Sequence, residues 1–166
     1  MRMRVLLKSV LDCEPDAAWR AIRSPQVMRE AAWPLLGFVS LERDGFPDSW
    51  PPGPHPAAVL ALGAVPVGEQ VIDISFSHRA GARIQTDAGR SVSGPMTAVT
   101  TWRHSIAIAP AEGGGTLYRD QLVFSAGLAT AALWPAYWAF WQWRMLRIRQ
   151  LAPSWRVPPA VRGDAG

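Results

Sequence analysis

The chain of 166 residues has a single cysteine, Cys13. One cysteine excludes an internal disulfide and leaves no partner for a cysteine-based metal site. Such cysteine usage suits a reducing compartment, so we expect a cytoplasmic protein. The start of the chain, residues 1–8, is basic and then apolar, as a signal peptide is. It lacks an adequate apolar core and a cleavage site, because Lys8, Asp12 and Glu14 interrupt it.

Several catalytic motifs are also missing. The three histidines lie on separate predicted elements without HExxH or Cys/His spacing, so we expect no metal. Gly113-Gly114-Gly115 is a hairpin turn and not a phosphate loop, since no helix with Lys-Ser/Thr follows it. Residues 89–94 lack the spacing of a nucleophile elbow, and no dinucleotide fingerprint occurs. We therefore expect no cofactor.

The net charge of +4 comes almost entirely from scattered arginines. The one basic cluster, Arg144, Arg147 and Arg149, is accompanied by no recognition-helix, zinc-finger or RNP-like pattern. We interpret this cluster as a solvated helix end, which the helix dipole favours. The sequence therefore predicts no nucleic-acid partner.

Apolar residues make up 49% of the chain and charged residues 18%, which is typical of a folded globular protein. The first strand has Val5, Leu7 and Leu11 on one face. Glu14-Pro15-Asp16 and Ser24-Pro25 are good helix starts. The later predicted strands are Leu35–Glu42, Val59–Val65, Glu69–His78, Ala82–Asp87, Met96–Pro110 and Thr116–Ser125.

A proline-rich segment at residues 43–56 separates two of these strands and is predicted to be irregular. His55 lies in this segment, and we expect no specific role for it. The segment is long enough to reshape or cover the entrance of a pocket.

The last predicted element is a helix over residues 128–151 that is apolar nearly all round. Its apolar run up to Trp143 is shorter than the ~20 residues that span a bilayer, and Pro135 and Gln142 interrupt it. We therefore expect no transmembrane span. Such a helix must be buried, and the preceding strands predict a curved sheet that buries it and leaves a cavity.

This order of elements resembles the START-like (SRPBCC) superfamily, which includes polyketide cyclase/dehydrase-like proteins. The resemblance is sharpest in Trp102-Arg103-His104, in residues 118–124 (YRDQLVF) and in residues 141–144 (WQWR). It implies an α+β helix-grip fold: a curved antiparallel sheet wrapped around a long C-terminal helix, with two short helices after the first strand. We expect one such domain over residues 1–153 and a flexible tail over residues 154–166.

Alternate residues of a strand share a face, so His104 on one hairpin strand and Asp120 on the next are predicted to point inward. Tyr118 lies on the same face as Asp120. A histidine beside a carboxylate and a phenol in an apolar pocket is suited to acid–base chemistry, so these three residues are the candidate catalytic group. A purely structural role, in which the buried pair satisfies its own hydrogen bonds, stays open.

Three functions follow as alternatives. The first is binding of an apolar small molecule, lipid- or polyketide-like, in the cavity. The second is a cyclase or dehydratase that uses His104 and Asp120 as acid and base. The third is contact with a membrane surface or a second subunit through the Trp/Arg-rich helix. The ligand-binding residues we expect are Trp102, Ile106, Leu122, Phe124, Trp138, Trp141 and His78.

Overall fold

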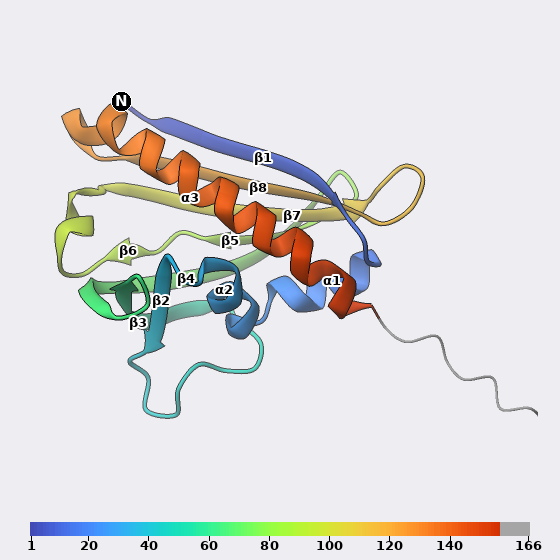
Figure 1. The fold of residues 1–166 in the computed structure, drawn as a ribbon, viewed down its shortest axis with the longest axis horizontal. Helices are drawn as coiled ribbons and strands as arrows, with labels where there is room; N and C mark the ends of the chain where they lie inside the picture. Colours follow the sequence, from blue (N-terminus) through green and yellow to red (C-terminus); the bar gives the residue numbers. More distant parts are fainter. Residues whose placement is uncertain (157–166) are drawn as a thin grey trace, which may run out of the picture.

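The computed structural model describes residues 1–156, and Figure 1 shows its arrangement. The helices are α1 (Pro15–Ile22), α2 (Pro25–Ala32) and α3 (Thr130–Leu151). The strands are β1 (Met3–Leu11), β2 (Leu36–Ser40), β3 (Gly53–Ala61), β4 (Val65–Arg79), β5 (Ala82–Asp87), β6 (Arg90–Ser91), β7 (Thr101–Pro110) and β8 (Thr116–Ser125).

The strands form one curved antiparallel sheet in the order β1-β8-β7-β5-β4-β3-β2, with the short β6 paired to β4. The helix α3 lies across one face of this sheet; α1 lies near the C-terminal end of α3, and α2 lies between α1 and β2 (Figure 1). This is the α+β helix-grip architecture that the order of elements predicts. A cavity lies between the sheet and the helices α2 and α3.

The alternation predicted for the hairpin is confirmed. β7 and β8 pair from Thr101↔Ser125 to Pro110↔Thr116, and the turn between them carries three glycines with positive φ. Tyr118, Asp120, Leu122 and Phe124 are all buried on the inner face of β8. On β1, Val5, Leu7 and Leu11 share this face, because they pair with Leu122, Asp120 and Thr116.

The proline-rich segment is partly regular, contrary to the prediction. β3 begins at Gly53 and contains Pro54 and Pro56. β2 pairs with β3 only from Ala57 onward, so β3 is a sheet edge at these prolines, and a missing backbone N–H breaks no ladder there. The strand boundaries predicted at Val59 and Met96 are also wrong, since β3 starts earlier and residues 95–98 form a 3₁₀ turn before β7.

His55 is a structural residue of this segment, which corrects the expectation that it does nothing specific. It is buried on β3, with Nδ1 3.0 Å from Oε1 of Glu42 and Nε2 3.2 Å from the carbonyl oxygen of Pro51. Its ring also packs against the fully buried Trp50. Glu42 and Pro51 lie near the two ends of the loop between β2 and β3, so these contacts hold that loop against the sheet.

The helix α3 is buried on one side only, although its sequence is apolar nearly all round. Trp141, Arg144, Met145 and Ile148 face the sheet and are buried, whereas Trp138 is 45% exposed. A single layer of sheet covers only one side of a helix, so the opposite apolar residues stay at the surface. The predicted tail is described only over residues 154–156, where Trp155 packs on the core, and its remaining residues lie outside the described part.

Candidate functional site

The interior polar cluster is built around Asp120, on the inner face of β8. Its Oδ1 accepts hydrogen bonds from Nε2 of His104 at 2.7 Å and from Nε1 of Trp141 at 2.8 Å. Its Oδ2 accepts from the hydroxyl of Tyr118 at 2.9 Å and from Nε of Arg144 at 3.1 Å. Asp120 is only 1% exposed, so these four donors replace the water that an ionised carboxylate needs. We call these five residues the Asp120 cluster.

The Asp120 cluster joins two layers of the fold. His104 and Tyr118 come from the hairpin strands β7 and β8, and alternation along these strands turns them to the inner face. Trp141 and Arg144 are three residues apart on α3, so they lie on the same side of the helix, facing the sheet. A sheet residue thereby receives two hydrogen bonds from the sheet and two from the helix.

The pKa of Asp120 is held below its usual range. Burial by itself raises this pKa, but the positive charges of His104 and Arg144 and the hydrogen bonds from His104 and Trp141 outweigh burial. The pKa of Tyr118 is shifted the other way, well above its usual value, by burial and by the neighbouring negative charge of Asp120. Near neutral pH, Asp120 is therefore an ionised acceptor and Tyr118 a neutral donor.

A second carboxyl group, Asp87 on β5, lies opposite His104 in the β5–β7 register. Its Oδ1 accepts the backbone N–H groups of Asp73 and Gly89, each at 2.9 Å, and its Oδ2 accepts Nε1 of Trp102 at 3.2 Å. Burial raises the pKa of Asp87 in spite of these donors. Asp87 therefore binds its proton more strongly than an exposed aspartate does.

A cavity of about 440 Å³ lies between the sheet, α2 and α3, next to the Asp120 cluster. Its volume is in the range of small-molecule sites. Most of its lining is apolar and comes from all three layers, including Met28, Leu36, Phe38, Ile72, Tyr137 and Phe140. Its polar lining residues are Gln70, Asp87, His104 and Arg144. The cavity therefore has an apolar body and one end with ionisable groups.

The structure brings together most of the predicted site residues. Trp102, His104 and Trp141 line the cavity, and Ile106 lines a small adjoining space of about 40 Å³. Leu122 and Phe124 are fully buried in the core beneath Trp141 rather than in the cavity wall. Tyr118 and Asp120 lie behind this wall and act on it through His104, Trp141 and Arg144.

Two predicted ligand-binding residues lie elsewhere. Trp138 stacks on Trp134 at the exposed side of α3 and is not part of the cavity lining. His78 is exposed at the end of β4, also away from this lining. His78 is exposed because it lies at the end of β4, and Trp138 is exposed because it lies on the outward side of α3.

Two important residues were missed by the sequence reasoning, Arg144 and Asp87. Arg144 was grouped with Arg147 and Arg149 as a solvated helix end, but it is only 6% exposed and pairs with Asp120. The available signal was its spacing of three residues from Trp141, which places both on one helix side. Asp87 carried no comparable signal, because its alternate neighbours Arg83 and Gln85 are polar and indicate a solvent face.

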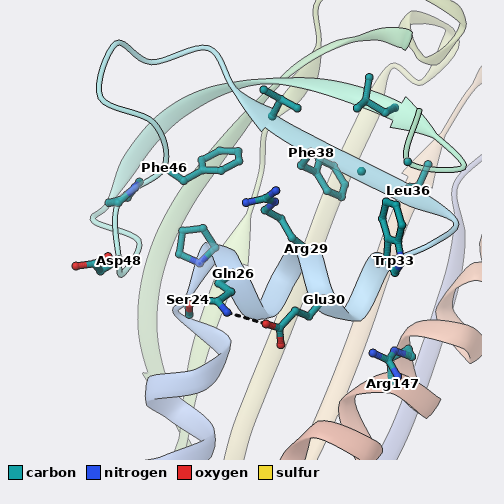
Figure 2. Close-up of a pocket in the computed structure, with 16 residues that line it drawn as sticks. Ser24, Gln26, Arg29, Glu30, Trp33, Leu36, Phe38, Phe46, Asp48 and Arg147 are labelled. Carbon is teal, nitrogen blue, oxygen red and sulfur yellow. Dashed lines mark hydrogen bonds between the residues drawn. The ribbon is translucent and has the colours of Figure 1, made fainter. Parts of the chain in front are cut away.

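A second hollow, of about 710 Å³, lies outside the sheet between α2 and β2 (Figure 2). Leu36 and Phe38 line both this groove and the cavity. The groove is bordered by exposed polar groups such as Arg29 and Asp48, and its Gln26 and Glu30 hydrogen-bond to each other along α2 at 2.8 Å. The cavity at the Asp120 cluster has the more apolar lining of the two and is the better place for an apolar ligand.

Neither a metal centre nor a membrane span is found in residues 1–156. No group of three or more His, Cys, Asp or Glu side chains in this range is arranged to hold a metal ion. None of the helices there combines the length and the apolar character that crossing a bilayer requires.

Known structures with the same fold include proteins of very different sequence. Protein CV1439 from Chromobacterium violaceum superposes with a TM-score of 0.60 at 17% identity, covering 90% of this chain and 96% of that one. Protein jhp0584 from Helicobacter pylori gives 0.61 at 10% identity, over 91% and 86%. Ara h 8.0201, a helix-grip protein, gives 0.60 at 14% identity, over 93% and 99%.

No family model matches the chain, and neither does any curated protein sequence. Identities of 10–17% establish the fold alone. The fold is therefore helix-grip, and the function has to be argued from the cavity.

Proposed function

We propose that the protein binds an apolar small molecule, lipid- or polyketide-like, in the cavity between the sheet and α3. The observation that carries this proposal is a cavity of about 440 Å³ whose apolar walls come from α2, the sheet and α3. A space of this size with a few convergent polar groups is the usual form of a ligand site. The polar end, at His104 and Arg144, orients the ligand.

Binding is tested with two measurements on the purified protein. Native mass spectrometry after gentle purification from the source cells detects a bound molecule, and denaturing release gives its mass. Titration with the neutral fluorescent probe N-phenyl-1-naphthylamine then measures the affinity of the emptied cavity. We expect saturable binding of one probe per chain. A protein that carries no adduct and leaves the probe unbound would rule out the proposal.

Acid–base chemistry in the same cavity is a second candidate, supported by one observation. His104 and Asp87 are neighbours across β5 and β7, and both line the cavity. Asp120 is less suited to move a proton itself, because both of its oxygens already accept two hydrogen bonds. Its part in such a reaction is to orient His104 through Nε2, which leaves Nδ1 for a substrate. His104→Ala would then abolish turnover of a discovered substrate.

The third predicted function is contact of the Trp/Arg-rich helix with a membrane surface or a second subunit, and it is supported by only a few exposed residues. Trp138 and Leu146 on α3 are about half exposed, and Arg149 is exposed near them in sequence. Flotation with liposomes and measurement of oligomeric state test this function separately from cavity binding.

A further inference from the structure

The guanidinium group of Arg144 is only partly used by the Asp120 cluster. Its Nε donates to Asp120, and the Tyr118 hydroxyl lies within hydrogen-bonding reach of the guanidinium; beyond these contacts, no hydrogen bond within the described residues engages its two Nη groups. The Nε atoms of Arg23 and Arg147 are buried without a partner, but the Nη groups of Arg144 are not closed off in this way. Arg144 lines the cavity, so part of its side chain borders that space.

A buried guanidinium with free N–H groups calls for an acceptor. Leaving such donors unpaired in an apolar interior costs free energy, whereas a ligand oxygen satisfies them. The planar fork of the two Nη groups matches the two oxygens of a carboxylate. Other acceptors such as a hydroxyl or an ester meet only part of the fork.

The charges around Arg144 nearly cancel, so the choice of ligand rests on the hydrogen-bond donors of Arg144. Asp120 supplies one negative charge, which Arg144 balances, and His104 adds a positive charge whenever it is protonated. The other carboxyl group of the cavity, Asp87, is the strand neighbour of His104 and lines a small adjoining space together with Arg144, but both of its oxygens already accept from Trp102 and two backbone N–H groups. The polar end therefore has donors to offer beyond what its own carboxylates use.

We propose that the ligand has an apolar body and a carboxylate head, and that the two Nη groups of Arg144 bind this head. This inference rests on the proposed function, because it assigns the chemistry of the molecule in the same cavity. The apolar lining takes the alkyl or aryl body, and His104, which lines the cavity beside Arg144, contributes a further donor when protonated. Arg144 thus links the ligand head to Asp120, and through it to the hairpin.

The test compares two ligands of one shape on the unaltered protein. Decanoate and decanamide share their chain and the planar outline of their heads, but only decanoate carries a negative charge. We expect decanoate to displace N-phenyl-1-naphthylamine at a concentration at least about tenfold lower than decanamide, a difference of about 1.4 kcal/mol. Equal displacement by the two would overturn the carboxylate assignment and leave the proposed function standing.

Two variants test whether Arg144 causes the preference for decanoate over decanamide. Arg144→Lys keeps the positive charge and loses the fork, so we expect the tenfold preference to fall severalfold. Arg147→Lys is the matched control, since Arg147 is on the same helix but lines the outer groove, and the preference should be unchanged there. A preference that survives in Arg144→Lys would contradict the assignment.

The remaining outcomes are also decisive. If Arg144→Lys does not fold, the comparison of decanoate with decanamide on the unaltered protein still tests the carboxylate head. If neither compound displaces a probe that itself binds, the carboxylate head is ruled out and the cavity is retained. If the probe does not bind either and the protein carries no adduct, both the inference and the proposed function are wrong.

Discussion

The Nε of Arg144 on α3 donates to Oδ2 of Asp120 on β8 at 3.1 Å, and both residues are almost completely buried. One charge comes from the helix and the other from the sheet, so the pair joins the two layers that enclose the cavity. Burying either charge alone would be costly, and together with three neutral or histidine donors they form a satisfied group. The shape of the polar end of the cavity depends on this pair.

The first prediction concerns the charge of Asp120. Asp120→Asn removes the partner of a buried Arg144 and replaces one accepting oxygen by an amide N–H₂ that faces other donors. We expect the free energy of unfolding to fall by about 3–5 kcal/mol, as when one member of a buried ion pair is lost. Urea unfolding followed by circular dichroism measures this. The control is Asp73→Asn on the exposed side of β4, which should stay within about 0.5 kcal/mol. Equal losses in the two variants would contradict the central place of Asp120.

The second prediction concerns pH. Because the folded-state pKa of Asp120 is depressed, its contribution to stability is fully present above the unfolded-state pKa of about 3.9. That contribution is lost as the pH falls from there through the folded-state pKa. Unfolding measured between pH 6 and pH 2 should therefore show an acid loss of stability that is smaller in Asp120→Asn.

Asp87 should behave in the opposite sense. Its folded-state pKa is raised, so its favourable contribution is present below the unfolded-state pKa and is lost as the pH rises through the folded-state pKa. Asp87→Asn removes this titration. The stability of the unaltered protein relative to Asp87→Asn should therefore fall as the pH rises from about 4. A difference that is constant with pH would show that the pKa of Asp87 is not raised.

The third prediction isolates one hydrogen bond from the helix. Trp141→Phe keeps an aromatic ring in the core but removes the N–H that donates to Oδ1 of Asp120 at 2.8 Å. Hydrogen bonds to charged groups contribute about 1.5–3 kcal/mol, so we expect a loss of that size in urea unfolding. Trp138→Phe makes the same chemical change at an exposed position of α3 and should cost much less. Comparable losses would mean that the indole ring, and not its N–H, is what matters.

The inner-face residues of the hairpin are the part of this site that can be predicted from the sequence. Alternation along β7 and β8 specifies which side chains share the inner face, so His104, Tyr118 and Asp120 could be placed together without a structure. Register is not encoded in alternation. His104 pairs with Leu122 in the ladder, and it reaches Asp120 diagonally.

The helix was harder to predict because its apolar residues surround it. Without a polar side, the pattern does not say which residues face the sheet, and Arg144 and Trp138 were both placed wrongly for this reason. The proline-rich segment failed differently. A run of prolines argues against a strand, but at a sheet edge prolines cost no ladder hydrogen bond.

The last prediction tests the cavity by filling part of it at Ala136. Ala136 on α3 lines the cavity, and the larger ring in Ala136→Phe would occupy part of the space that a ligand needs. We expect N-phenyl-1-naphthylamine to bind about tenfold more weakly, a loss of about 1.4 kcal/mol. The matched control is Ala132→Phe, one helical turn earlier at an exposed position that is not part of the cavity lining. Both changes alter the helix propensity equally, so their thermal stabilities should be similar and only the binding should differ.

If both variants bind the probe as the unaltered protein does, the probe site lies outside this cavity. Loss of binding in Ala132→Phe alone would place that site outside the cavity, at the N-terminal end of α3.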